Sequence, residues 1–271
     1  VIFSYGLIFG AWGLPALGGA GAGLGTSLAL YLGSALYLLQ TWRAAREHGF
    51  LRARPSRATL RNILRISLPN GVQQFFFATG LTVLFWIIGR VGADEVAVAH
   101  ILITLILFLI LPAIGLGLSA ASLVGQALGR RDADDAYRWG WDVTRLAVSL
   151  LFVLALPMWL VPDLILGLFL KQPALVELGR APLMITGLAI CLDGVAIIFT
   201  QALLGAGAAR SVMVVTLAVQ WFFFLPLAYI IGPVLGYGLL GIWLAQAFQR
   251  LITSLLLSGL WIKRGWAHIE L

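Results

Sequence analysis

The stretch Ile101-Leu102-Ile103-Thr104-Leu105-Ile106-Leu107-Phe108 decides the fold class of this chain. Its residues do not alternate between apolar and polar, as the strands of a membrane-spanning barrel do over about ten positions. The stretch also lies inside an uncharged run that exceeds the roughly twenty apolar residues that a helix needs to cross a bilayer. It therefore predicts a membrane-spanning helix.

The rest of the sequence has the same character. Apolar residues make up 61% of the chain and charged residues 11%, against about 25% charged residues in an average soluble domain. Because so few charges cannot cover the apolar surface in water, we expect an all-α integral membrane protein built as a polytopic helical bundle. The expected spans are a partial one at residues 1–10 and complete ones at 16–41, 70–91, 96–118 (continuing as helix to Ala127), 141–161, 178–203, 212–231 and 238–262.

Basic residues gather on one side of these spans. Short loops rich in Lys and Arg stay cytoplasmic, and with the connector at 43–65 inside, thirteen basic residues lie inside and only Arg90, Lys171 and Arg180 lie outside. This bias predicts a multi-pass protein of the bacterial inner (plasma) membrane with a cytoplasmic C-terminus. Tryptophans near the span ends, Trp261 among them, are expected in the interfacial belts.

The basic connector divides the chain into two parts. Residues 1–42 are expected to be the last two spans of an N-terminal lobe, the first of them truncated; residues 66–262 form a complete six-span C-terminal lobe, and 263–271 a cytoplasmic tail. The first and last hairpins both have a loop with Pro and Gly followed by Gly-x-x-Gly, an echo that favours the duplicated lobes of secondary transporters. We therefore expect four further spans in a full-length parent. The paired glycines are Gly18 and Gly21, and Gly238 and Gly241.

Local signals predict how some helices begin. Arginines at three- and four-residue spacing, opposite Leu60 and Ile63, predict a surface helix in the connector, with Ser56 as its N-cap. Its expected partner is the anionic face of the lipid bilayer, and no nucleic acid is expected. Further along, Asp132 and its acidic neighbours are expected to be loop and cap residues.

Asp193 is the residue whose position within a membrane span most needs an explanation. It lies near the middle of the 178–203 span, where an ionised carboxylate costs at least about 2.5–3.5 kcal/mol on insertion scales. One interpretation is that it faces a wet cavity and alternates between ionised and protonated or ion-bound states. The other is a permanent pair with Arg250, which is equally deep in its own span. A pair that breaks during a transport cycle would combine the two, and the sequence does not decide between them.

Uncharged polar and aromatic side chains inside the spans predict a polar, partly aromatic interior. A glutamine there can line a cavity or join two helices, and a phenylalanine can face a flat cation or simply pack. The sequence shows no phosphate-binding glycine loop, metal-ligand cluster or Ser/His/Asp set, so we expect no enzyme, no catalytic residue, no metal and no cofactor. The candidate cavity residues are Gln73, Gln74, Phe77, Gln201, Gln220, Gln246 and Arg250.

Several motifs in order resemble the multidrug and toxic compound extrusion (MATE) family. They are Ser67-Leu68-Pro69 with Gln73-Gln74-Phe75, Val91-Gly92-Ala93 with Ala97-Val98-Ala99-His100, Leu123-Val124-Gly125-Gln126-Ala127-Leu128-Gly129, and Leu203-Leu204-Gly205-Ala206-Gly207. The resemblance implies an antiporter of two six-helix lobes that exports amphipathic, often cationic, drugs in exchange for H+ or Na+. Asp193 matches an acidic position of some members, whereas a second acidic position is Phe77 here, which departs from a two-acid sodium site.

Two other interpretations stay open. A flippase for lipid-linked precursors has a related two-lobe fold, but it needs a larger and more basic cavity than one buried Arg250 suggests. The chain could also be a non-transporting membrane fragment, because half a cavity cannot alternate access. The sequence upstream of Val1 would test this, since four more apolar segments in frame would exclude a remnant.

Overall fold

Helices make up almost all of the structure. The computed structural model describes residues 2–13, 15–45 and 56–268, and no strand occurs in those ranges. Seven helical segments are long and apolar enough to cross a bilayer, so the all-α membrane fold is confirmed. The elements are α1 (Ile2–Phe9), η1 (Ala11–Gly13), α2 (Gly18–Ala45), α3 (Arg57–Gly89), α4 (Ala93–Gly129), α5 (Ala133–Leu160), α6 (Pro162–Gly167), α7 (Pro173–Gly205), α8 (Ala209–Leu217), η2 (Ala218–Phe224), α9 (Leu225–Tyr229), η3 (Ile230–Val234), α10 (Gly238–Ile262) and η4 (Gly265–His268).

Each complete span expected from the sequence has a counterpart among these helices. Several helices continue past the apolar run, because a helix can extend into the interfacial region where its side chains are polar. For example, α5 begins at Ala133, well before the apolar run at 141–161. The partial span at 1–10 corresponds to α1, which ends at Phe9.

The span expected at 212–231 is continuous but not uniform. It runs from Ala209 to Val234 through α8, η2, α9 and η3, and both η2 and η3 are π-helical. Pro226 has no amide hydrogen and its ring crowds the carbonyl four residues earlier, which favours a widened turn over the regular α-helical one. The helix opens locally on both sides of Pro226, in the form of π-helical turns.

Residues 1–61 and 62–271 form two compact units. In the first unit, α1 lies against α2 through glycines. A Cβ added to Gly21 would lie 2.2 Å from the carbonyl oxygen of Leu7, and one added to Gly25 would lie 2.6 Å from Cα of Ser4. No larger side chain fits at either position, as is typical of closely packed membrane helices.

The echo between the first and last hairpins extends to their geometry. Gly18 and Gly238 both have a positive φ, of 55° and 60°. Gly21 lies against the preceding helix, and Gly241 likewise leaves only 2.5 Å between an added Cβ and Cγ2 of Ile231. In both Gly-x-x-Gly sequences the first glycine therefore adopts a positive φ and the second allows close helix packing. The duplication of whole lobes stays a prediction.

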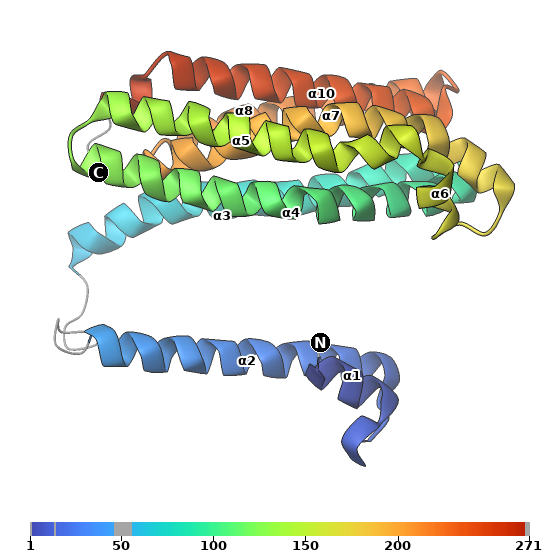
Figure 1. The fold of residues 1–271 in the computed structure, drawn as a ribbon, viewed down its shortest axis with the longest axis horizontal. Helices are drawn as coiled ribbons and strands as arrows, with labels where there is room; N and C mark the ends of the chain where they lie inside the picture. Colours follow the sequence, from blue (N-terminus) through green and yellow to red (C-terminus); the bar gives the residue numbers. More distant parts are fainter. Residues whose placement is uncertain (1, 14, 46–55, 269–271) are drawn as a thin grey trace. The chain divides into compact units, whose positions relative to one another are not determined.

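The second unit is a bundle with α7 at its centre. Figure 1 shows α4, α5, α7 and α10 lying side by side, with the short α6 at one end, and α7 contacts α4, α5 and α10. Alanines occupy many of the closest positions, which lets the helix backbones approach each other. The fully buried ones include Ala99, Ala113, Ala120, Ala127, Ala147 and Ala155.

The connector helix and the following span form one helix. Ser56 caps it, because its Oγ accepts the amide hydrogen of Thr59 at 3.1 Å. The helix α3 then continues without a break through Pro69 to Gly89, so the helix predicted in the connector and the following span are one continuous helix. Pro69 lacks an amide hydrogen and so interrupts one backbone hydrogen bond, which membrane helices tolerate when neighbouring groups satisfy the freed carbonyl. The remainder of the connector, residues 46–55, lies outside the described residues.

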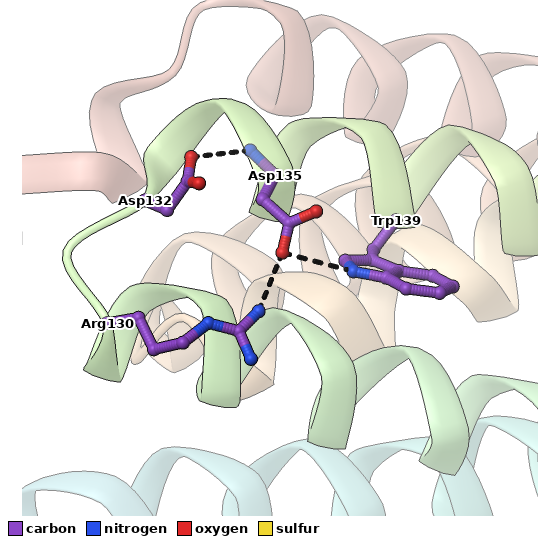
Figure 2. A network of polar contacts seen from close by, with 4 residues as sticks. All are labelled: Arg130, Asp132, Asp135 and Trp139. Carbon is purple, nitrogen blue, oxygen red and sulfur yellow. Dashed lines mark hydrogen bonds and ion pairs between the residues drawn. The ribbon is translucent and has the colours of Figure 1, made fainter.

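The turn between α4 and α5 forms a polar network at one end of the bundle (Figure 2). Asp132 Oδ1 accepts the amide hydrogen of Asp135 at 2.9 Å, which confirms its predicted role as N-cap of α5. Nη2 of Arg130 lies 2.7 Å from Oδ2 of Asp135, and Nε1 of Trp139 donates to the same oxygen at 3.3 Å. The network therefore caps α5 and links its first turn to the end of α4, where the chain reverses direction.

Trp261 lies in the core of this end of the bundle, so its assignment to an interfacial belt is wrong. Its side chain is fully buried and stacks on both Tyr137 and Trp266. The facing residue on α5 is Gly140, and a Cβ there would lie only 2.4 Å from Cζ2 of Trp261. The absence of a side chain on Gly140 makes the space for the indole, and only the packing of α5 against α10 shows this.

Candidate functional site

Asp193 and Arg250 meet across the contact between α7 and α10. Nη1 of Arg250 donates to Oδ2 of Asp193, and the two groups form an ion pair. The side chain of Arg250 is 11% exposed and that of Asp193 is 19% exposed. The pair is therefore nearly withdrawn from solvent, where breaking it by removing one partner costs about 3–5 kcal/mol.

A second polar contact joins the same two helices. Nε1 of Trp243 donates to Oγ1 of Thr186 at 2.9 Å, and that hydroxyl donates in turn to the carbonyl oxygen of Pro182 at 2.9 Å. Trp243 and Thr186 are both buried. The hydroxyl thus uses its hydrogen and a lone pair within the protein, so this contact is complete.

The two contacts are related by one heptad. Thr186 precedes Asp193 by seven residues on α7, and Trp243 precedes Arg250 by seven on α10. A seven-residue step returns to the same face of a helix when two helices supercoil, and both pairs run in the same direction, so α7 and α10 are parallel. We call these four residues the α7–α10 seam.

The sequence does not by itself predict the contact between Trp243 and Thr186. Thr is common in membrane helices and Trp243 reads as one more apolar residue of its span. The signal is the equal separation of 57 residues in both pairs, and it becomes meaningful only when α7 and α10 are known to be in contact.

Two of the predicted cavity glutamines are contacts between helices. Gln201 on α7 lies against α4, where a Cβ added to Gly117 would be 2.8 Å from its Cγ. Gln220 on η2 lies against α3, where a Cβ added to Gly80 would be 2.0 Å from its Nε2. In these two places a missing side chain makes room for an amide, which is a common way of joining membrane helices. The structure does not join either one to the α7–α10 seam.

Gln73 lies in a different environment, beside the contact of α3 with η2. Its Oε1 is buried without a hydrogen-bond partner, and so is Nε1 of Trp221 on η2. Trp221 also makes an edge-on contact with Phe76 of α3, with ring centroids 5.4 Å apart. A buried acceptor and a buried donor, both free, are the groups that a bound molecule could satisfy.

Two of the remaining predicted cavity residues, Gln74 and Phe77, are exposed on α3, and the side chain of Phe77 is 54% exposed. Gln246 lies one helical turn before Arg250 on α10 and is partly buried. A shallow, open groove of about 430 Å³ follows one face of α3, lined by Leu64, Ser67, Leu68, Gly71, Val72, Phe75 and Phe76.

No group of three or more His, Cys, Asp or Glu side chains that could hold a metal occurs among the described residues. In the structure the carboxylate of Asp193 has one cationic partner, the guanidinium of Arg250. What the seam offers chemically is one carboxylate, one guanidinium and no second carboxylate between α7 and α10.

Comparisons with known proteins agree with this architecture. The sequence profile of the MatE family matches residues 69–230. A probable multidrug resistance protein NorM from Thermotoga maritima is 28% identical over 98% of this chain and 58% of its own length. A probable multidrug resistance protein NorM from Pseudomonas aeruginosa is 31% identical over 89% of this chain and 51% of its own length.

Among solved structures, one described as the outward-facing conformation of a multidrug resistance MATE family transporter of the MOP superfamily has a TM-score of 0.85 at 17% sequence identity. It covers 99% of this chain, and the chain covers 60% of it, so the likeness shows a shared fold. The chain spans less than two thirds of the length of these relatives. The helical bundle, the order of its motifs and the family profile lead to one conclusion, that this chain belongs to the MatE family.

Proposed function

We propose that the protein exports amphipathic, often cationic, organic compounds in exchange for H+ or Na+, with Asp193 as the coupling carboxylate. Membership of the MatE family supports export, because relatives are named as multidrug resistance proteins. Since the chain spans only part of their length, the activity is proposed for the protein as a whole.

The observation that carries the role of Asp193 is its place in the seam. A carboxylate in the middle of a span is costly, and membrane proteins retain one where it pairs, faces a cavity or binds a cation. Asp193 is paired with Arg250 by a single contact, and its side chain is 19% exposed, so the pair is mostly buried between α7 and α10. A carboxylate neutralised by one cationic partner is a group that can exchange that partner for another cation.

We place the substrate contacts apart from the coupling carboxylate, at the junction of α3 and η2. Supporting this are the free acceptor of Gln73, the free donor of Trp221 and the aromatic faces beside the α3 groove. The π-helical turn at η2 adds to the argument, because such turns are frequent at functional sites. Of the predicted cavity residues, this arrangement uses Gln73 and leaves Gln201 and Gln220 as contacts between helices.

Export assayed in everted membrane vesicles, where an exported compound accumulates inside the vesicle, tests the role of Asp193. A proton or a sodium gradient is imposed in separate experiments, and extrusion of a fluorescent organic cation is followed in wild type and in Asp193→Asn. We expect gradient-driven efflux to fall about tenfold or more in the variant, under whichever gradient drives the wild type, because the amide cannot carry the exchanged charge.

The matched control is Asp163→Asn. Asp163 also pairs with an arginine, Arg180 at 3.6 Å, but both side chains are at least half exposed at a bundle end. This variant should keep wild-type efflux. Equal efflux in Asp193→Asn and wild type would show that Asp193 does not couple transport.

The orientation of the bundle is part of the same proposal. We place the end with the α4–α5 turn and the C-terminus of α10 in the cytoplasm and the whole in a bacterial inner membrane. The support is the excess of basic residues at that end, which include Arg130, Arg131, Lys263 and Arg264.

A further inference from the structure

The charge of the seam restricts what can bind to Asp193. An arginine side chain keeps its proton in proteins, so Arg250 remains a cation throughout. The pair is neutral as it stands, and a proton or a sodium ion added to Asp193 would leave a net positive charge between two helices. With Arg250 in contact, the carboxylate therefore has no capacity for a second cation.

The seam allows the guanidinium to leave without separating the helices. The contact between Trp243 and Thr186 holds α7 and α10 together one heptad away, and it contains no ionisable group. Arg250 has a long, flexible side chain, and Gln246 offers an amide oxygen one turn earlier on the same helix. One contact of the seam can thus open while the other stays closed.

We propose that Arg250 is a tethered competitor of the cation that Asp193 binds. Its guanidinium occupies the site in the conformation seen here, and a proton or a monovalent cation binds Asp193 only after the guanidinium withdraws. This rests on the proposed coupling role of Asp193 and adds a second residue to it. Arg250 acts as a positioning residue, because it sets when the carboxylate is available and is not itself carried or transferred.

Cation binding to the full chain, purified in detergent, tests this directly. The variant is Arg250→Gln, which keeps a polar side chain and removes the competing charge. Three arms identify the cation: equilibrium binding of radioactive sodium, equilibrium binding of tetraphenylphosphonium, and the infrared carbonyl stretch of a protonated carboxyl group. In at least one arm, Arg250→Gln should gain a cation relative to wild type, with affinity raised about tenfold or more for an ion.

The double variant Asp193→Asn/Arg250→Gln is the control for site and fold. It removes both charges and leaves two amides that can bond to each other, so the seam should stay folded. The gain seen in Arg250→Gln should disappear here, which assigns the cation to Asp193. A merely structural role for Arg250 predicts instead that binding of sodium and tetraphenylphosphonium weakens or stays unchanged, whereas an unpaired buried carboxylate takes up a proton under either role.

The outcomes are separate from those of the efflux experiment. If no arm shows a gain in Arg250→Gln, the competition is refuted, whatever happens to efflux. If efflux is unaffected by Asp193→Asn while Arg250→Gln gains a cation that the double variant lacks, the proposed coupling fails and the competition between Arg250 and a cation stands. Arg250→Lys, which keeps the charge, should behave as wild type in all three arms.

Discussion

Replacing Gly140 by alanine should destabilise the bundle, although alanine is the better helix former. The new Cβ would lie 2.4 Å from Cζ2 and 2.5 Å from Cε2 of Trp261. That indole cannot withdraw, because it is fully buried against Tyr137, Phe199 and Trp266. Overpacking of a tight core costs about 1–3 kcal/mol, whereas the change from glycine to alanine in a helix returns about 0.5–1 kcal/mol.

A matched variant separates the two contributions. Gly115 lies inside α4, and a Cβ added there would meet no atom within 4 Å. Gly115→Ala should therefore show the gain in helix propensity alone. The free energies of unfolding of the two alanine variants should differ by about 1–3 kcal/mol, which is the overpacking contribution.

The measurement is unfolding of the purified chain by sodium dodecyl sulfate, followed by circular dichroism of the helices. A double-mutant cycle with Trp261→Phe adds a specific check, because a phenyl ring lacks the Nε1 and the fused atoms that face Gly140. The two changes should couple by about 1 kcal/mol or more, in the direction of rescue. The reasoning is refuted if Gly140→Ala is as stable as Gly115→Ala, or if the two changes are additive.

Three further predictions follow from other parts of the bundle. Arg131 has a φ of 61°, so Arg131→Gly should raise the free energy of unfolding by about 1 kcal/mol, whereas Arg130→Gly, at a φ of −84°, should lower it; equal effects would exclude strain at Arg131. Trp243→Phe and Thr186→Val should each cost about 1 kcal/mol and couple in a double-mutant cycle, and additive losses would mean that their hydrogen bond contributes nothing. In a Cys191→Ser background, Arg90→Cys should react with a membrane-impermeant maleimide on intact cells while Lys263→Cys should not, and the reverse pattern would invert the proposed orientation.

The helices themselves were predictable because the transfer of a segment into lipid depends on its own composition. The run around Ile101–Phe108 predicts a span wherever its neighbours lie, and α4 confirms it. Ser56 and Asp132 are equally local, since a capping side chain bonds an amide only a few residues ahead. The motifs that resemble the MATE family are local as well, and the family is confirmed.

Contacts between helices were not predictable in the same way, because they depend on which faces meet. The sequence offered a permanent pair, a free carboxylate or a breakable pair for Asp193, and the structure shows it in contact with Arg250. For each glutamine the sequence left two roles open, lining a cavity or joining two helices, and Gln201 and Gln220 lie in separate helix contacts made possible by glycines on the facing helices. Trp261 was expected at the membrane interface, but its indole is buried in the space left by Gly140 on the facing helix.

The sequence by itself determined that this chain is a multi-span helical membrane protein with one carboxylate deep in a span, because apolar transfer and charge burial are properties of each segment. Only the tertiary structure decided what that carboxylate faces. Its partner comes from a helix 57 residues further along, and the parallel packing of α7 on α10 brings the two charges together.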